Sequence, residues 1–584
     1  MSNSTQKTST KMFVNGVLIL TISNIIVKAI GLLFKIPLRN ILGNIGMGYF
    51  NAAYTIYTAF FMISTAGLPV AISYMVSRSR AAGNFNQVKK IMRIAFIVFF
   101  IIGSIGTLAL FFGADFFANA VDIPASEKCI MAIAPTLFFV CLTSAFRGYF
   151  QGHQIMWPTA VSQLLESLGK LLIGILLANW SIAQGHDIKE TAAWTIFGLT
   201  IGVFVGMAFI WLTKLLYNTK KVNAEYELEN SYSMQTERTR TLLKELVVMA
   251  VPVTLSSSVM SLANFIDLAV ISRQLQSIGF TEQGAAALYG DYTTLAVPLF
   301  NLIPVLVYPI GYSLVPMISA LLVKKEHQRS NQVITSSLKT AAILSLPCTV
   351  GMAVLASPIL KLIYGSKSLI SEYTAASINP NDPNQADAVK VLGDSKFMNL
   401  LGENTSSADL VAPLLSILAI SSFLVCMLAI TNAILQANKK PYLPLISMLI
   451  GAGAKVLASF LLIGNESIGI FGAPISTDIC YIIVVLCNFF FCAKYANFRP
   501  SVRKVFLKPL IAAALCGAAA FGTYSLGEMI IGPSRIIAIP AIGVAAIVYF
   551  GAVLLIGALE KDDFEFIPMG GKLLKILTKL RLVK

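Results

Sequence analysis

The sequence contains few charged residues. Asp, Glu, Lys and Arg make up 12% of its 584 residues, whereas hydrophobic residues make up 56%, and the mean hydropathy is +0.76. A soluble globular domain has about 25% charged residues. The shortage of charge therefore excludes an ordinary soluble domain and indicates a polytopic membrane protein.

The sequence is also short of the motifs that enzymes use. Its three histidines, His153, His186 and His327, lie in expected loops without metal-ligand or triad spacing. It has no Walker A sequence for binding nucleotide phosphates. The eight cysteines lie in or beside apolar segments without CxxC spacing, so we interpret them as packing residues. We expect no catalysis, no cofactor and no metal site.

Long apolar segments dominate what remains. A hydrocarbon core of about 30 Å needs about 20 helical residues per crossing. On this measure the chain is predicted to be an all-α membrane protein with fourteen transmembrane helices. The spans are expected near residues 13–37, 49–77, 90–113, 129–146, 159–178, 192–213, 246–272, 289–322, 334–360, 410–436, 443–463, 470–493, 509–527 and 536–559.

Lys and Arg are unevenly distributed between the loops. If both termini are cytoplasmic, the inside segments hold 31 of the 44 Lys and Arg residues and the outside segments hold 10. Positive residues accumulate on the cytoplasmic side of membrane proteins. The bias predicts a multi-pass protein of the cell membrane with both ends inside. Basic cytoplasmic loops that face anionic lipid also explain the net charge of +16, without nucleic acid as a partner.

Two stretches of the chain occur twice. Residues 151–177 align with 436–462 at an offset of 285 without a gap, and residues 86–88 align with 331–333 at an offset of 245. Two halves of six spans each enter from the same side, so the repeat is parallel. We expect a six-helix bundle at 1–216, a cytoplasmic linker at 217–243, a second six-helix bundle at 244–496 with an outside polar loop at 366–408, helices 13 and 14 at 497–570, and a cytoplasmic amphipathic tail at 571–584.

Charged residues lie inside several predicted spans. Glu166 and Lys170 are four residues apart on one helix face, so a self-neutralising pair is one interpretation. The repeat places Lys455 at the position of Lys170, but Gly451 at that of Glu166. A lone Lys at mid-span costs about 2.5–3.5 kcal/mol on insertion. Its recurrence in the repeat therefore favours lysines that face a polar cavity.

The first span also carries cations. Lys28 lies more than two turns from either end, whereas Lys35 and Arg39 lie at the outer end, where snorkelling to the headgroups would explain them. Acidic residues are fewer, and for them a structural salt bridge and a coupling-ion ligand both stay open. They are Asp267, Asp291 and Asp478, in the seventh, eighth and twelfth spans. Together with Glu166 they are the candidates for a titrating group that couples transport to an ion gradient or the membrane potential.

Proline and glycine interrupt two of the spans. Such breaks free backbone groups, so they are typical of helices that line cavities or bend. Packing alone is the alternative interpretation, since proline is common in transmembrane helices. The hinge candidates are Gly67 and Pro69 in the second span, and Pro298, Pro304 and Pro309 in the eighth.

Several motifs carry a resemblance to a known family. They are the two six-span repeats with two further spans, the segment FRGYFQGHQIMWPTAVSQLLESLGK, and LPVAIS near the end of the second span. Together they resemble the polysaccharide-export branch of the multidrug/oligosaccharidyl-lipid/polysaccharide (MOP) exporter superfamily. Within it, the chain is most similar to the group of stage V sporulation protein B and the Gram-positive lipid II flippases. Lys28-Ala-Ile-Gly31 matches that group's basic-x-x-Gly pattern, whereas Asp291-Tyr292 departs from the Asp-Arg pair of Gram-negative members.

The resemblance implies a flippase with a cation-lined cavity between two bundles and a groove for the lipid tail near helices 13 and 14. Such a protein moves an undecaprenyl-pyrophosphate-linked glycan precursor, here expected to be lipid II for peptidoglycan or spore cortex, by alternating access. The cations expected to hold its negative headgroup are Lys28, Lys35, Arg39, Lys170 and Lys455. The implied partners are this lipid-linked oligosaccharide, membrane lipids and cell-wall synthesis proteins. Alternatives are a multidrug or cation antiporter of the same superfamily and an exporter of another polyprenyl-linked polysaccharide unit. A glycan polymerase would need an outward-facing catalytic constellation, which the sequence does not offer.

Overall fold

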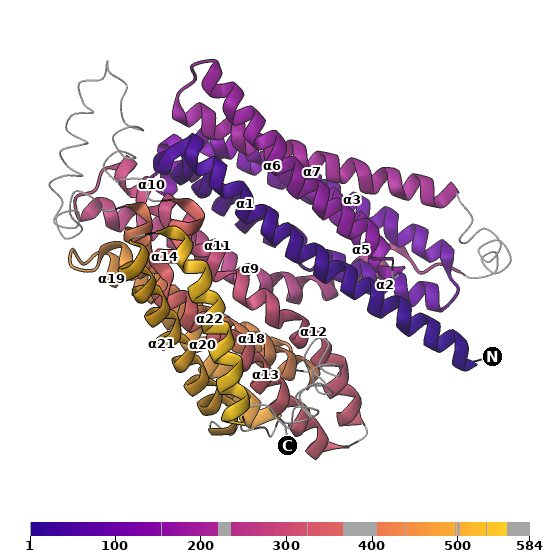
Figure 1. Ribbon diagram of the computed structural model, residues 1–584. Coiled ribbons are helices and arrows are strands. Elements are labelled where there is room, and N and C mark those ends of the chain that lie inside the picture. Colours follow the sequence, from indigo (N-terminus) through magenta and orange to yellow (C-terminus); the bar gives the residue numbers. More distant parts are fainter. Residues whose placement is uncertain are drawn as a thin grey trace. The chain divides into compact units, whose positions relative to one another are not determined.

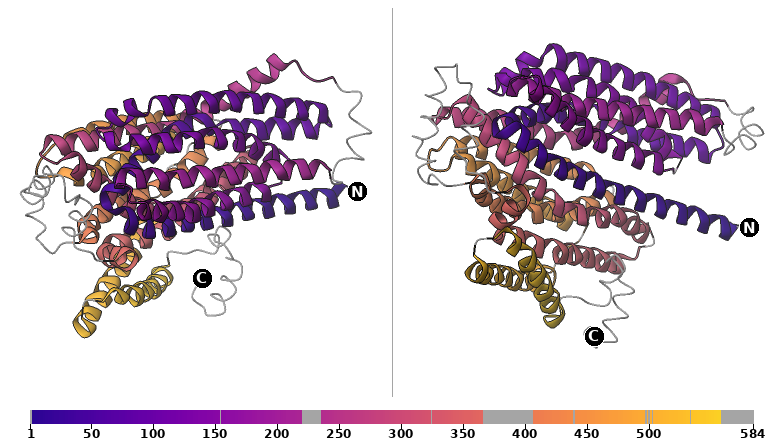
Figure 2. Two further views of the ribbon diagram at one scale, coloured as in Figure 1. Left: turned by 90° about the horizontal axis from the view of Figure 1, so that it is seen from above. Right: turned by 45° about the horizontal axis from the view of Figure 1, so that its top comes forward.

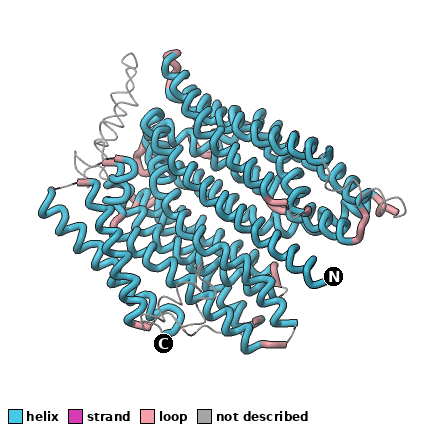
Figure 3. Tube along the Cα trace, turned by 45° about the vertical axis from the view of Figure 1, so that its right-hand side comes forward, coloured by secondary structure: helices cyan, strands magenta, loops and turns pink. Residues whose placement is uncertain are grey.

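The computed structural model describes most of the chain: residues 2–153, 155–219, 235–323, 325–365, 406–438, 440–496, 498, 501, 503–532 and 534–557. The described residues form helices and connecting turns, with no strand among them (Figure 3). The amphipathic tail predicted at 571–584 lies outside the described residues. So do most of the linker predicted at 217–243 and nearly all of the polar loop predicted at 366–408.

The chain divides into two compact units, and the first comprises residues 1–276 and 281–290. Its helices run nearly parallel or antiparallel to one another (Figure 2). They are α1 (Ser2–Thr65), α2 (Leu68–Ala81), α3 (Phe85–Phe112), α4 (Ala114–Ala120), α5 (Glu127–Gly152), α6 (Trp157–Ala183), α7 (Ile188–Thr219), α9 (Thr239–Ser277) and α10 (Glu282–Asp291).

The second unit comprises residues 277–280 and 291–584. Its last two long helices, α21 and α22, pack against each other, and both contact α13 (Figure 1). The described elements are η2 (Tyr292–Ala296), α11 (Val297–Phe300), α12 (Leu302–Val323), α13 (His327–Val354), α14 (Ala356–Tyr364), α18 (Ser407–Ala437), α19 (Tyr442–Ile463), α20 (Gly472–Tyr495), η4 (Arg503–Leu507), α21 (Lys508–Ile531) and α22 (Ala538–Leu555).

The predicted partition into two repeats and a linker stays a prediction. The first compact unit includes α9 and nearly all of α10, which follow the predicted linker in the sequence. The repeat itself has a counterpart in the helix boundaries. Helix α5 ends at Gly152 and α6 begins at Trp157. Helix α18 ends at Ala437 and α19 begins at Tyr442, so both boundaries recur at the offset of 285.

The predicted all-α membrane fold is confirmed, but the count of fourteen spans is not. The described residues contain 12 helices that are long and apolar enough to cross a membrane, or 13 if the bent pair Thr239–Leu255 and Ser258–Ser277 is one span. Most of the first predicted span and all of the second lie in one helical stretch of 59 residues, Ile22–Arg80. At 1.5 Å per residue this stretch measures about 88 Å, which is long enough for two crossings.

Helix α1 is broken within this stretch. Gly43 has φ 62° and ψ −172°, so two helices meet there across a kink. A positive φ strains most side chains but not glycine. The chain can therefore change direction at Gly43 while Lys28, Lys35 and Arg39 stay on the segment before the kink.

Glycines set the spacing of α6 and α7, which lie side by side in Figure 1. A Cβ atom added to Gly169 would lie 2.5 Å from the Cα of Gly202, and one added to Gly198 would lie 2.5 Å from the Cα of Gly174. Small residues let transmembrane helices approach until their backbones touch. The hairpin thereby holds Glu166 and Lys170 of α6 against α7.

Candidate functional site

Three lysines come together in the first unit. Lys28 and Lys35 lie on α1 and Lys170 lies on α6, two helices that pack against each other. Lys170 interacts electrostatically with both Lys28 and Lys35. Lys28 is exposed, and Lys35 and Lys170 are half-buried. Like charges repel one another, so the group gains from a negatively charged ligand. We call Lys28, Lys35 and Lys170 the lysine cluster.

Aromatic rings position the ammonium group of Lys170. Its Nζ lies 5.1 Å from the ring centre of Phe34 and 4.8 Å from that of Tyr54. An ammonium over an aromatic face is stabilised by about 0.5–2 kcal/mol, more as it loses contact with water. Phe34 is buried and the side chain of Lys170 is half-buried. The rings thus hold the cation without neutralising it.

Glu166 pairs with an arginine of α5 instead of with Lys170. The Nη2 of Arg147 donates to Oε1 of Glu166 at 2.7 Å, and Nε and Nη2 of Arg147 both donate to the hydroxyl of Ser162, at 3.1 and 3.0 Å. The interpretation of Glu166 and Lys170 as a self-neutralising pair is therefore wrong. An ion pair forms where the charged atoms approach each other closely. The planar guanidinium of Arg147 offers several N–H donors, whereas Lys170 offers a single ammonium group.

Arg39 is buried and does not snorkel to the headgroups. Its side chain is 6% exposed, and Nη2 donates to Oδ1 of Asn44 at 3.3 Å. Asn44 follows the kink at Gly43 directly. Arg39 therefore contacts both sides of the break in α1, whereas Lys35 is half-buried one turn before it.

The lysine of the second repeat lies in the second unit. Lys455, on α19, is 3% exposed. At Gly451, where the first repeat has Glu166, an added Cβ would lie 2.3 Å from Cγ2 of Val484 on α20. Close packing of α19 and α20 leaves no room for a glutamate there, which explains why the repeat keeps the cation without the acid.

The acidic candidates occupy separate places. Asp267, on α9 of the first unit, interacts with Tyr289, whose hydroxyl hydrogen-bonds with Thr55 at 2.8 Å. Asp291 is 1% exposed at the end of α10. In the second unit, the carboxylate of Asp478 on α20 accepts a hydrogen bond from the hydroxyl of Ser421 on α18. All three carboxyl groups are buried.

Helices break at Gly67–Pro69 and near Pro298, but α12 continues through Pro304 and Pro309. α1 ends at Thr65 and α2 begins at Leu68, with Pro69 in its first turn. The eighth predicted span is divided into α10, a π-helical turn at Tyr292–Ala296, α11 and α12. Pro298 lies in the first turn of α11, and Pro304 and Pro309 lie in α12. Movement at these breaks stays a prediction.

Gly67 permits a close backbone contact at the first of these breaks. A Cβ at Gly67 would lie 2.1 Å from the carbonyl oxygen of Ala250, and its backbone N–H donates to the hydroxyl of Thr254 at 3.1 Å. Both contact residues belong to α9. A helix break and a helix crossing thus coincide at one glycine.

Sequence reasoning missed Arg147 and a buried lysine. Lys339 lies within the span predicted at 334–360 but was not among the charged candidates, and it is 4% exposed inside α13. For Arg147 a signal did exist. Arg147 and Ser162 are equally far from the middle of the α5–α6 turn, so an antiparallel hairpin brings them together.

Ionic contacts at both ends of α9 were also missed. At one end, Arg78 of α2 binds Glu245 through two hydrogen bonds, of 2.5 and 2.9 Å, and approaches Glu237 at 3.4 Å. At the other end, Nε of Arg273 donates to Oδ2 of Asp122 at 2.9 Å. The partners are more than 150 residues apart in the sequence, so no local pattern indicates them.

Comparisons with known proteins give a consistent result. Residues 13–322 match the model of a family described as polysaccharide biosynthesis protein. Over 572 residues the chain is 25% identical to the lipid II flippase MurJ of Bacillus subtilis (strain 168), covering 94% of this chain and 96% of the relative. It is 23% identical over 566 residues to stage V sporulation protein B of the same organism, covering 96% and 99%.

Solved structures agree on the fold. An inward closed conformation of the lipid II flippase MurJ superposes with a TM-score of 0.61 at 14% sequence identity, covering 92% of this chain and 98% of that one. An inward-facing multidrug resistance MATE family transporter of the MOP superfamily gives 0.58 at 13% identity, covering 81% and 94%. Both solved structures therefore share the helical architecture described above.

Proposed function

Because the chain belongs to the polysaccharide biosynthesis protein family, we propose that it is a flippase for an undecaprenyl-pyrophosphate-linked glycan precursor, with lipid II as the substrate. The precursor moves from the inner to the outer leaflet by alternating access, and both termini of the chain are cytoplasmic. The named relatives that support this proposal are a lipid II flippase and a sporulation protein, each matched over nearly the whole length of both chains.

The lysine cluster carries the proposal. Three ammonium groups that repel one another within a membrane protein favour an anionic headgroup over a cationic drug, and a pyrophosphate diester brings a compact negative charge. The Nζ of Lys170 is held over the rings of Phe34 and Tyr54, which orients it for an anionic group. Arg39 holds the shape of α1 beside Lys35. A role of Lys455 in binding the headgroup stays a prediction from the sequence.

The prenyl chain of the substrate stays in lipid throughout. Helices α21 and α22 present large apolar side chains outward, among them Met529, Ile547 and Phe550, with exposed fractions of 84%, 74% and 66%. These side chains suit contact with a long hydrocarbon tail, as the resemblance implied. Cell-wall synthesis enzymes that consume the precursor on the outer side are the proposed protein partners, in vegetative growth or in spore cortex formation.

Reconstitution tests the proposal directly. Purified protein is placed in liposomes with fluorescent lipid II, and the fraction that an outside reagent reaches is measured over time. Lys28→Ala and Lys170→Ala are expected to lower the transfer rate at least about tenfold, since each removes one charge-assisted contact of about 1.5–3 kcal/mol. Lys189→Ala, which removes an exposed lysine at the start of α7, is the matched control and is expected to leave the rate unchanged.

The outcomes separate the candidate substrates and classes. Transfer of lipid II no faster than in empty liposomes, with transfer of another polyprenyl-linked sugar, would assign the chain to a different polysaccharide unit. A cation antiporter is the second candidate, because Asp267 and Asp478 are buried carboxylates on a MATE-like fold. For that function, drug efflux would survive Lys170→Ala and would be lost in Asp478→Asn.

A further inference from the structure

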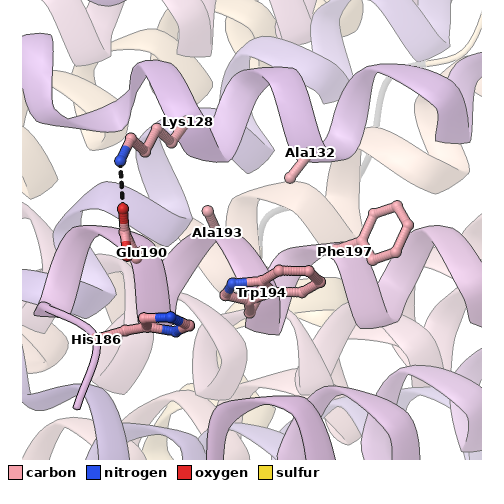
Figure 4. Close-up of a pocket in the computed structure, with 7 residues that line it drawn as sticks. All are labelled: Lys128, Ala132, His186, Glu190, Ala193, Trp194 and Phe197. Atoms are coloured by element: carbon pink, nitrogen blue, oxygen red, sulfur yellow. Dashed lines mark hydrogen bonds and ion pairs between the residues drawn. The ribbon is translucent and has the colours of Figure 1, made fainter. Parts of the chain in front are cut away.

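A groove opens on the first unit between the start of α5 and the start of α7, away from the lysine cluster. It has a volume of about 460 Å³, within the range of about 300–1,000 Å³ typical of small-molecule sites. Charged and aromatic side chains occupy different ends of it (Figure 4). The lining residues are Lys128, Ala132, His186, Glu190, Ala193, Trp194 and Phe197.

The groove lies at the ends of two helices that are predicted to cross the membrane. Lys128 is the second residue of α5 and Glu190 is the third residue of α7, and both helices are long and apolar enough to cross a bilayer. Trp180, at the end of α6, meets Trp194 edge to face with ring centres 5.1 Å apart. Tryptophans concentrate at the membrane–water interface. The distribution of basic loops predicts that this is the outer interface.

The polar end of the groove carries one charge of each sign. Nζ of Lys128 lies 2.6 Å from Oε1 of Glu190, and the two side chains are 58% and 36% exposed. His186 is held beside them by Ser181, whose hydroxyl is 3.1 Å from Nδ1 of the histidine. An exposed ion pair contributes only about 0–1 kcal/mol. The two groups can therefore separate at little cost when a ligand offers a negative group to Lys128 and a positive group to Glu190.

The apolar end continues along lipid-facing side chains. Trp194 and Phe197 line it from α7, with ring centres 6.1 Å apart, and Ala132 and Ala193 keep it open because their side chains are small. Further along the same two helices, Phe139 and Phe204 pack against each other with ring centres 5.2 Å apart. An occupant thus meets charges at the interface and hydrocarbon toward the membrane interior.

We propose that this groove binds an aminophospholipid of the outer leaflet, with its phosphate on Lys128, its ammonium group on Glu190 and the upper part of one acyl chain along Trp194 and Phe197. A zwitterionic headgroup finds an opposite charge for each of its own charges. An anionic headgroup without an amine gains the attraction of Lys128 but meets the repulsion of Glu190. The site is independent of the proposed flippase substrate.

Quenching of tryptophan fluorescence by brominated lipid tests this site. The chain has four tryptophans, and the substitutions Trp157→Phe and Trp211→Phe leave only Trp180 and Trp194, which meet beside the groove. The full-length protein is reconstituted in phosphatidylcholine vesicles with rising fractions of dibrominated phosphatidylethanolamine or dibrominated phosphatidylglycerol. Lipid in general contact with the protein quenches equally in both series, so the difference between the two headgroups reports the site. Phosphatidylethanolamine is expected to bind about two- to fivefold more tightly.

Four variants decide the assignment of the charges. Glu190→Gln is expected to reverse the preference in favour of phosphatidylglycerol, and Lys128→Gln is expected to abolish binding of both above the level of bulk lipid. Ala193→Phe keeps both charges but fills the groove, so it is expected to remove the preference in a folded protein. Lys189→Gln, next to the site, is expected to change nothing. Equal quenching by the two lipids in the starting protein, or an unchanged preference in Glu190→Gln, would overturn the proposal.

Discussion

The half-buried ion pair between Arg147 and Glu166 allows a sharp test of whether Glu166 is structural or takes part in ion coupling. The two side chains are 14% and 17% exposed and join α5 to α6. Arg147 also donates twice to Ser162, so its guanidinium depends on two neighbouring acceptors. A Cβ at Gly206 of α7 would lie 2.6 Å from Cγ of Glu166, which shows how closely the glutamate is packed.

The perturbation is Glu166→Gln, which keeps the size of the side chain and removes its charge. Breaking a fully buried ion pair costs about 3–5 kcal/mol because the remaining charge is left without a partner. Partial exposure lets water reach Arg147, so we expect a smaller loss, about 2 kcal/mol. In a unit of this size, 1 kcal/mol corresponds to about 2–4 °C. The apparent Tm of Glu166→Gln should therefore fall by about 4–8 °C.

A double-mutant cycle isolates the pair. Arg147→Met removes the cation, and the double variant Arg147→Met/Glu166→Gln leaves neither charge without its partner. Side chains in direct contact show coupling energies of about 0.5–3 kcal/mol. The double variant is therefore expected to be more stable than the sum of the two single losses predicts. Thermal unfolding of the detergent-purified protein is followed with a fluorescent dye that does not react with thiols. It is measured for the original protein, the two single variants and the double variant.

Transport by the same variants completes the test. If Glu166 is a structural partner of Arg147, the double variant is expected to transfer lipid II at a rate near that of the original protein once temperature is set below both transitions. Strictly additive losses of stability would refute the ion-pair reasoning. Loss of transport in Glu166→Gln at unchanged stability would refute the structural role and favour the titrating role considered from the sequence.

Three further predictions concern other parts of the chain. Gly67→Ala places a Cβ against a backbone carbonyl of α9, so it is expected to lower the free energy of unfolding by about 1–3 kcal/mol in thermal unfolding, whereas Gly31→Ala, which meets nothing within 4 Å, is not. Arg78→Glu and Glu245→Arg are each expected to lower stability by about 0.5–1 kcal/mol, and the double swap is expected to recover most of this loss in the same assay. Under the proposed function, Asp478→Asn is expected to remove the response of lipid II transfer to an imposed ion gradient, whereas binding of lipid II to the protein is expected to persist. An unchanged response excludes Asp478 as a coupling group.

The sequence predicted the features of this fold that depend on nearby residues. Apolar length predicted the membrane helices, and proline and glycine predicted the breaks before Leu68 and around Pro298. Recurrence of a lysine at an offset of 285 led to Lys170, which the structure places with Lys28 and Lys35. These results depend on helix geometry and on the cost of charge in a membrane, which act at every position in the same way.

Features that depend on which helix lies beside which were not predicted. The partner of Glu166 was sought one turn away on the same helix, but α5 supplies it. The sequence separated the first two spans at 37 and 49 but did not indicate that helix continues between them, interrupted only by Gly43 with its positive φ. Contacts such as those of Asp122 with Arg273 join residues that are distant in the chain, and their chemistry leaves no trace in either local sequence.

The glycine contacts between α6 and α7 have a mechanical consequence. Two backbones that touch at Gly169 and Gly202, and again at Gly174 and Gly198, cannot slide past each other without a clash of main-chain atoms. The hairpin is therefore expected to move as one rigid unit in any rearrangement of the protein. Lys170 follows Gly169 directly. Its ammonium group is therefore expected to move with the whole α6–α7 hairpin and not through a distortion of α6 alone.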